Sequence, residues 1–431
     1  MKRFGLFFIS CLAAALTGCT STDPLPEQSA AHPASTYEQA GMLAQVVEFL
    51  NSHYVNENKV GYDRLLTAAL RGMMRELDPY SGYEPPAEFT VNEESRTGEQ
   101  SGIGIDAVKV KNAPALITAV IPGGPADKAG VLPGEQIFRI DGRPVEALPL
   151  EECMDLLRGP EGSELELELL ASDGKSSRSV KLRREKVVRS SVPPEAAHLI
   201  DGDIGYLRIS SFNAHTPGEV EKALQFLRSA GMSRGLVIDL RNNPGGLVDG
   251  AAKTASLFLP AGSVIFSAKH RNSPEVEVVR SVAGELREET LPVVILTNAY
   301  TASAAELFSG ALRDHNRAKL VGAKTFGKGT LLRILPLANG GALRFAAGRY
   351  LTPSGRAIEG NGLAPDVPVE LDLPTQWKLN AQLMSRPGVV QPDGKDAVRD
   401  TQLEAALKLL TARNDAPNAT RQSETLRRSC P

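Results

Sequence analysis

The pattern of apolar and polar positions divides the chain into a helical beginning, a strand-rich middle and a mixed α/β remainder. Between residues 37 and 77 apolar side chains recur every three or four positions, which predicts amphipathic helices. Pro79 in the sequence Asp78-Pro79-Tyr80-Ser81 cannot continue a helix and restricts the residue before it. We therefore predict a helical N-terminal segment over residues 37–98.

Residues 99–186 consist of short apolar runs separated by glycine and proline, which predicts a compact, mostly β module containing a helix at Leu150–Leu157. In residues 187–375 strand patterns alternate with helical ones, as in an α/β domain. Residues 376–431 form a tail with a helix at 403–410. The strands expected in the α/β part are 205–209, 235–240 and 292–297, and the helices are 217–230 and 303–312.

Composition adds further limits to this picture. A chain of 431 residues favours two or three domains. Its formal net charge is −3, and no long run of Lys or Arg occurs, so nucleic acid is not an expected partner. No metal-ligand spacing occurs, and neither a metal nor another cofactor is expected. Cys153 and Cys430 are too far apart in sequence to suggest a disulfide framework, and we expect Cys153 to be a buried apolar residue.

The first residues have the features of an export signal. Lys2 and Arg3 precede an apolar run, Phe4–Leu16, that is too short to span a membrane. It ends in Leu16-Thr17-Gly18-Cys19, which resembles a bacterial lipobox; a plain cleavage site with an accidental cysteine is the alternative. We expect a signal peptide at 1–18, lipidation of Cys19, and a flexible tether at 19–36. Thr20 then favours the periplasmic face of the outer membrane in a bacterial cell envelope.

A glycine-rich segment opens the strand-rich module. In Ser101-Gly102-Ile103-Gly104-Ile105 the glycines leave backbone N–H groups exposed, where they can hold a terminal carboxylate. Together with the segments 124–131 and 134–142, it resembles a circularly permuted PDZ domain, in which Glu135 replaces a usual Asp. The resemblance implies that a peptide C-terminus binds at Gly102, Ile103, Gly104 and Ile105. A small β-barrel without a ligand is the alternative.

Two junctions in the α/β part carry candidate chemistry. One strand pattern runs into Gly245-Gly246, and another leads to Ser303 at the start of a helix, where free N–H groups favour negative charge. A serine in this position is often only a helix cap. Lys328 lies between Gly327 and Gly329. Neither a Gly-x-Ser-x-Gly elbow nor a well-placed histidine is present, which leaves a Ser-Lys dyad as the route to an activated serine.

These segments resemble the tail-specific, or carboxyl-terminal processing, proteases of serine peptidase family S41. The family implies a ClpP/crotonase-like α/β core with an inserted, mostly β PDZ domain and helical terminal segments. It further implies Ser303 as nucleophile, Lys328 as general base, and an oxyanion hole made by the N–H groups of Gly246 and Ala304. Expected partners are substrates with free C-termini, a membrane through the lipid anchor, further copies of the chain, and an adaptor protein.

Lys328 must be neutral to act as a base. A free lysine is neutral in roughly one molecule in 2500 at pH 7, a deficit of about 4.6 kcal/mol. Burial can lower a lysine pKa by up to about 3–5 units, so we predict a largely apolar pocket around the Lys328 amine.

One position departs from the family pattern. The family places a glutamine, whose amide orients the lysine, four residues after it; here that position is Leu332. Loss of this hydrogen-bond partner costs about 1–3 kcal/mol. The alternative functions are therefore a weak or inactive PDZ scaffold that only binds peptides and, on the shared fold alone, acyl-CoA chemistry.

Overall fold

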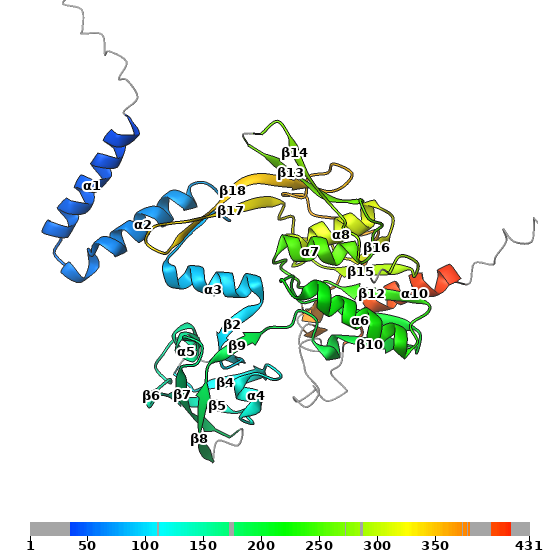
Figure 1. Cartoon of the computed structure of the whole chain (residues 1–431), viewed down its shortest axis with the longest axis horizontal. Helices are drawn as coiled ribbons and strands as arrows, with labels where there is room; N and C mark the ends of the chain where they lie inside the picture. Colours follow the sequence, from blue (N-terminus) through cyan, green and yellow to red (C-terminus); the bar gives the residue numbers. More distant parts are fainter. Residues whose placement is uncertain are drawn as a thin grey trace, which may run out of the picture. The chain divides into compact units, whose positions relative to one another are not determined.

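The computed structural model describes residues 35–109, 112–171, 176–271, 273–284, 288–372, 374–376, 378–379 and 398–414. The chain divides into two compact units, Met1–Ala69 and Leu70–Pro431. The first contains α1 (Thr36–His53), the 3-10 helix η1 (Glu57–Lys59) and the beginning of α2 (Tyr62–Arg75) (Figure 1). The Ser35 hydroxyl accepts from the Glu38 N–H while Glu38 accepts from the Ser35 N–H, and this reciprocal pair starts α1. The helices predicted for this region are confirmed.

The strand-rich module belongs to the second unit and is inserted into it through a two-stranded ribbon. The chain enters along β2 (Glu99–Gly102) and leaves along β9 (Glu185–Val188), and these strands pair antiparallel. Between them lie the sheet β3-β4-β5-β7-β8, with β6 beside β5, and the helices α4 and α5. The bounds are β3 Ile105–Val108, β4 Ala115–Val120, α4 Pro125–Lys128, β5 Gln136–Ile140, β6 Arg143–Pro144, α5 Leu150–Leu157, β7 Glu164–Leu170 and β8 Ser177–Arg183. Cys153 lies buried in α5, as predicted.

The α/β part contains a six-stranded sheet in the order β10-β11-β12-β15-β16-β19. β10 and β11 pair antiparallel, and every other neighbouring pair is parallel. Because the carboxyl ends of parallel strands meet at one edge, the loops after them come together there. The strands are β10 Ala197–Ile200, β11 Ile204–Arg208, β12 Gly235–Asp239, β15 Val293–Thr297, β16 Ala318–Gly322 and β19 Val367–Pro368.

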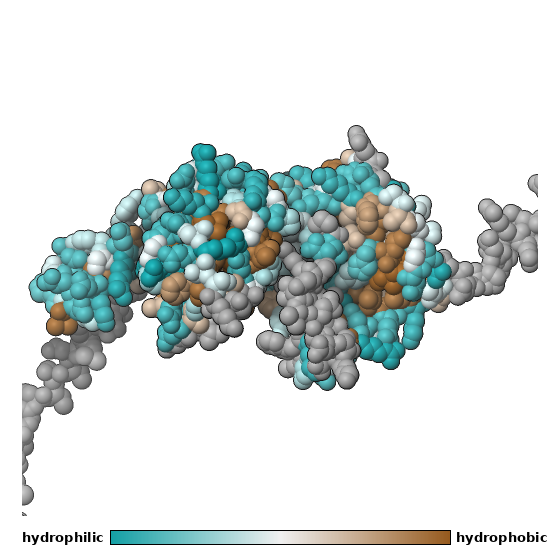
Figure 2. All heavy atoms as spheres, turned by 90° about the horizontal axis from the view of Figure 1, so that it is seen from below, coloured by the Kyte–Doolittle hydropathy of each residue, from teal (hydrophilic) through white to brown (hydrophobic). Residues whose placement is uncertain are grey.

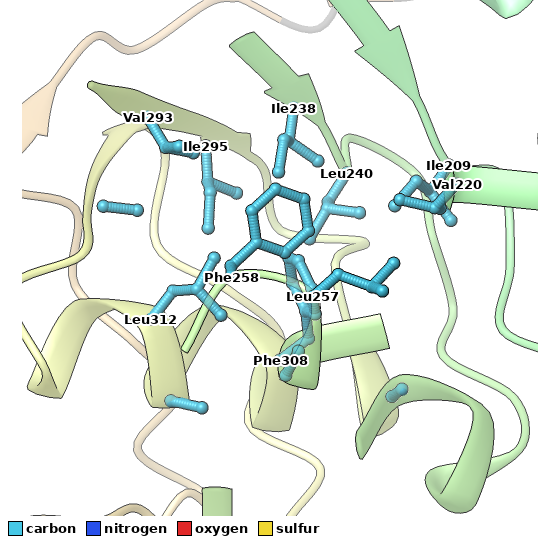
Figure 3. Packing of buried hydrophobic residues seen from close by; sticks show 14 of the residues in the cluster. Ile209, Val220, Ile238, Leu240, Leu257, Phe258, Val293, Ile295, Phe308 and Leu312 are labelled. Carbon is cyan, nitrogen blue, oxygen red and sulfur yellow. The ribbon is translucent and has the colours of Figure 1, made fainter. Parts of the chain in front are cut away.

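Helices cover both faces of this sheet. The helices α6 (Thr216–Ala230), α7 (Val248–Ser256) and α8 (Ala304–Asp314) pack on one face, and α10 (Thr401–Asn414) packs on the other. β12 serves both layers, since Ile238 belongs to the first core and Val237 to the second. Figure 3 shows Phe258 in the first core, near Ile238, Ile295 and Leu312. The fold is thus a three-layer α/β sandwich.

A second sheet has the order β1-β18-β13-β14, with β17 paired to β18. Its first strand, β1, lies within the segment predicted to be helical, and α3 follows it. The sequence pattern missed β1 because its partner, β18, is far away along the chain. The bounds are β1 Gly82–Glu84, α3 Pro86–Thr97, β13 Val264–His270, β14 Val276–Arg280, β17 Thr330–Pro336 and β18 Ala342–Leu351.

On the face drawn in Figure 2, hydrophilic surface predominates and apolar atoms gather in separate patches. Among the described residues, no helix is long and apolar enough to cross a membrane.

A buried ion-pair cluster attaches α10 to the end of β12. The Arg241 guanidinium, only 2% exposed, binds Asp239 at 2.6 Å and Asp400 at 2.8 Å. Tyr206 also donates to Asp239, at 2.7 Å. Burial alone would raise the pKa of Asp239, but the charge and hydrogen bonds of Arg241 outweigh it and hold the pKa below its usual value. The cluster fixes the loop that begins at Arg241.

We predict that Arg241→Met lowers the free energy of unfolding by about 3–5 kcal/mol, because it leaves the Asp239 carboxylate buried without its cation. Urea unfolding followed by circular dichroism measures the loss. The matched control is Lys253→Met, which breaks the exposed pair with Asp249 and costs less than about 1 kcal/mol. Equal losses in the two variants would contradict a structural role for the cluster.

Candidate active site

Ser303 occupies a strained turn between β15 and α8. Its backbone has φ +55° and ψ −120°, a region that residues with a side chain rarely adopt. The hydrogen bonds that fix it there use its backbone: the N–H donates to Glu306 at 2.8 Å, and the carbonyl accepts from Glu306 N–H and Leu307 N–H. Strained backbone of this kind concentrates at functional sites. The turn places the partly buried Ser303 at the carboxyl edge of the parallel sheet.

Glu306 joins the turn at Ser303 to the loop of Lys328. This fully buried carboxylate accepts from Ser303 N–H and Lys328 N–H through the same oxygen, Oε2, at 2.8 Å each. Its other oxygen, Oε1, accepts from Gly327 N–H at 2.7 Å and from the Thr325 hydroxyl at 2.6 Å. Burial raises the pKa of Glu306 above its ordinary value, and the four hydrogen bonds act against that rise. The two sequence-predicted catalytic residues therefore share one hydrogen-bond acceptor.

The Lys328 amine lies over the ring of Tyr80, 5.0 Å from its centroid. Burial lowers the pKa of the amine, Arg344 lowers it further, and Glu359 acts in the opposite direction. The lowered pKa agrees with the requirement for a neutral base. The aromatic ring of Tyr80 is one side of the surroundings of the amine, and the largely apolar pocket predicted there stays a prediction.

A second carboxylate fixes the chain after Lys328. Glu359 accepts from Gly329 N–H at 2.8 Å and from the Thr330 hydroxyl at 2.6 Å. The consecutive N–H groups of residues 327, 328 and 329 are thus all bound by Glu306 or Glu359. Leu332 lies further along β17, where it pairs with Ala346 and offers no side-chain hydrogen-bond acceptor.

The predicted oxyanion donors are also near Ser303. A Cβ on Gly245 would lie 2.8 Å from the Ser303 Cβ and 2.9 Å from the Ala304 nitrogen, so only glycine fits at that position. Gly246 forms an isolated parallel bridge with Phe212. In this bridge the Phe212 N–H donates to the Gly245 carbonyl, and the Phe212 carbonyl accepts from the Leu247 N–H. This pattern leaves the Gly246 N–H outside the bridge. Ala304 begins α8, where an N–H has no partner within the helix.

The predicted peptide-binding residues line a groove in the strand-rich module. One side of the groove is formed by Gly102, Ile103, Gly104 and Ile105. The other side is formed by Met154 and Leu157 of α5 and by Arg158, which follows the helix. β3, which begins at Ile105, is an edge strand of its sheet and therefore has an unpaired side for an added strand. The groove holds only about 10 Å³ of free space, so an incoming peptide would have to separate α5 from the glycine loop.

Sequence reasoning missed the roles of Glu306, Tyr80 and Glu359. Glu306 gave one local signal, because it stands three residues after a serine at a helix start, which is the spacing of a capping box. Tyr80 and Glu359 reach Lys328 from distant parts of the chain, and no local pattern indicates that. Cys19 and Cys430 lie outside the described residues. Within the described ranges, no group of three His, Cys, Asp or Glu side chains could hold a metal ion.

Comparisons with known proteins agree with this geometry. The profile of "Peptidase family S41" matches residues 203–369, and that of "PDZ domain" matches residues 116–171. The chain is 35% identical over 348 residues to a "Carboxy-terminal-processing protease" of Bartonella bacilliformis, covering 80% of this chain and 78% of that protein.

Two further relatives have similar names. A "Probable CtpA-like serine protease" of Staphylococcus aureus is 35% identical over 340 residues, covering 78% of this chain and 66% of that protein. The solved structure of a "Photosystem II D1 C-terminal processing protease" is 26% identical, with a TM-score of 0.45, and the match covers 78% of this chain and 94% of that one.

We predict that Glu306→Gln loosens both the turn of Ser303 and the loop of Lys328. The amide has one acceptor oxygen, and its NH₂ group would face N–H donors, so the variant loses about 1–3 kcal/mol for each buried donor left unpaired. Amide hydrogen exchange at Ser303, Gly327 and Lys328 should speed up about tenfold or more. The control is Glu219→Gln, whose carboxylate accepts from Ser191 and Val192 instead. Unchanged exchange at Lys328 in Glu306→Gln would show that the shared acceptor does not hold this loop.

Proposed function

The chain belongs to peptidase family S41, among the carboxy-terminal-processing serine proteases with a PDZ domain, and from this premise we propose that it is an endopeptidase with a Ser303–Lys328 dyad. The observation that carries the proposal is the shared acceptor. One oxygen of the buried Glu306 binds the backbone N–H of both residues, which brings the turn of Ser303 and the loop of Lys328 together.

In the proposed reaction the Ser303 hydroxyl attacks the carbonyl carbon of the scissile peptide bond while the Lys328 amine takes its proton. The carbonyl oxygen gains the negative charge, which the N–H groups of Gly246 and Ala304 stabilise. Lys328 then gives the proton to the departing amine, and the C–N bond breaks. Water, deprotonated by the same lysine, hydrolyses the Ser303 ester and regenerates the hydroxyl.

The state of the Lys328 amine supports this role. A base must hold an electron pair at working pH, and burial together with Arg344 lowers the pKa of the amine. The Tyr80 ring, at 5.0 Å, also limits where the amine can lie. Leu332 offers no amide to orient it, so the backbone hydrogen bonds at residues 327–329 have to set its direction.

We propose that the PDZ domain selects substrates by an exposed C-terminus. The added strand would lie beside β3, with its carboxylate at the loop of Gly102 and Gly104 and its side chains toward α5. Glycines at these positions keep the backbone open to a ligand, and Gly104 has φ +77°, which only glycine adopts without strain.

We propose a location and an assembly for the chain as well. The export signal and Cys19 favour a lipid-anchored protein at the periplasmic face of the outer membrane. Helix α1 has no buried residue, and its exposed apolar side chains favour contact with a second copy of the chain. An adaptor that delivers substrates is a further proposal from the family.

We predict that protein from residue 20 onward degrades casein, that Ser303→Ala and Lys328→Ala abolish this cleavage, and that Leu332→Gln is equal to or up to about a hundredfold faster than wild type. The gain is expected because a glutamine would supply the missing acceptor. Product analysis by gel and mass spectrometry measures the rates, and circular dichroism checks that each variant is folded.

Two results would contradict the proposal. Cleavage that survives Ser303→Ala would exclude this nucleophile. If neither wild type nor Leu332→Gln cleaves casein while peptides with a free C-terminal carboxylate still bind, the chain is a peptide-binding scaffold.

We predict that kcat/KM rises with pH along a single acid limb. The neutral amine is the active form, so the rate falls about tenfold for each unit below the pKa of Lys328. Because that pKa is lowered in the folded protein, the midpoint lies below that of a free lysine. A rate measured from pH 5 to 10 tests this, and a flat profile would remove Lys328 as the base. Lys328→Arg is the control, since it stays charged and should show no activity at any of these pH values.

A further inference from the structure

A pocket of about 650 Å³ lies beside the proposed base. Tyr80, whose ring covers the Lys328 amine, lines this pocket. Thr330, which follows the lysine, and Glu359, which accepts a hydrogen bond from Thr330, line it as well. The remaining lining comes from the turn at residues 77–79, from residues 269–271 at the end of β13, and from residues 346–349 of the neighbouring strand β18. A peptide extending from the site could therefore enter this pocket directly.

Three cations stand on one wall of this pocket. Lys269 and Arg349 are direct cross-strand partners in the β13–β18 ladder, and Arg271 follows two positions after Lys269. Residues directly opposite one another point to the same side of a sheet. All three are exposed, and within the described part of the chain none has an ion pair or a side-chain hydrogen bond.

The carboxylates of the pocket are already engaged. Asp78 accepts from Tyr80 N–H, Ser81 N–H and the Ser81 hydroxyl, at 2.6–2.7 Å. Glu359 accepts from Gly329 N–H and from Thr330. His270 bonds to Glu277 at 3.1 Å. Both acids thus already accept hydrogen bonds from the chain around them, through Oε2 alone in the case of Glu359, whereas the three cations lack an acceptor.

Like charges directly opposite each other destabilise an antiparallel pair. The Lys269–Arg349 pair carries this cost without a carboxylate between its members. A bound anion would remove the repulsion and give both cations a charge-assisted hydrogen bond.

We propose that this pocket binds a carboxylate of the peptide substrate, supplied by an acidic side chain or by the free C-terminus. This deepens the proposed function and rests on it. The pocket would act as a specificity subsite beside Lys328, separate from the PDZ groove, and would favour substrates with a negative charge near the cleaved bond.

The test uses quenched fluorescent peptides of one sequence in four forms, with Asp or Asn at one position and a free acid or an amide at the C-terminus. Wild type should cleave the carboxylate forms about tenfold more efficiently than the Asn amide, and added salt should reduce the difference. In Lys269→Gln/Arg349→Gln the ratio should fall to about one. The control Lys222→Gln, an exposed lysine on α6, should keep the wild-type ratio. The Asp and free-acid arms show which carboxylate is bound.

A charge reversal makes the test independent of folding defects. Arg349→Glu should shift preference toward a peptide with Lys in place of Asp, a gain that misfolding cannot produce. Wild-type cleavage with no charge preference, or a preference that persists in the double variant, would overturn the pocket assignment and leave the peptidase intact.

If wild type does not cleave, the same labelled peptides are titrated against Ser303→Ala by fluorescence anisotropy. Carboxylate-dependent binding that weakens about tenfold in Lys269→Gln/Arg349→Gln, but not in Lys222→Gln, would support the pocket although the proposed peptidase function had failed. Binding that is the same in all variants would overturn the pocket assignment, since it would then come from the PDZ groove.

Discussion

A carboxylate placed in a protein interior costs several kcal/mol unless hydrogen bonds replace the water it loses. Glu306 meets this requirement with four donors from two segments, the turn of its own helix and residues 325–328. Because each donor would itself be left unpaired if its segment moved, neither segment can shift without a penalty in the other. The relative position of Ser303 and Lys328 therefore depends on one side chain that takes no part in the proposed chemistry. The strained backbone of Ser303 persists because these bonds hold it.

The loop after β12, which contains Gly245 and Gly246, is tied to the turn of Ser303 by a second set of hydrogen bonds. Asn242 and Asn298 exchange hydrogen bonds at 2.8 and 3.0 Å, and Ala302 N–H donates to Asn243 O at 3.0 Å. Arg241 then connects this loop to α10 through Asp400. The loops after β12 and β15 thus form one hydrogen-bonded assembly, and α10 supports it from the opposite face of the sheet. The C-terminal helix thereby contributes to the geometry of a site that it does not touch.

The sequence predicted three of the six strands of the mostly parallel sheet, because β11, β12 and β15 each contain an apolar run, and it predicted α6 and α8 from their helical patterns. It also placed Gly246 and Lys328 in loops and Ser303 and Ala304 at a helix start, and the fold brings these segments to one edge of the sheet, although their catalytic roles stay predictions. It did not indicate β1, which forms a strand only because β18 accepts it. Tyr80, Glu359 and the pocket cations were missed for the same reason: their contacts join segments far apart in the chain. The apolar surroundings expected for Lys328 stay a prediction, because burial and the neighbouring cation Arg344 both lower the pKa of its amine.

The absence of an amide at position 332 changes how the lysine has to be oriented. The Tyr80 ring attracts the charged amine and so favours the protonated form, whereas burial and Arg344 favour the neutral one. The ring limits where the amine can lie, but none of these forces fixes its direction as a hydrogen-bond acceptor would. Direction instead has to come from the backbone, where three consecutive N–H groups are bound by Glu306 and Glu359, while the carbonyls of Gly327 and Gly329 accept from Gly360 and Tyr350. A lysine has four side-chain torsions, so fixing its backbone narrows the positions of the amine without selecting one. The lost amide therefore weakens the alignment of the base without removing the base, and for this reason Leu332 is compatible with a working peptidase.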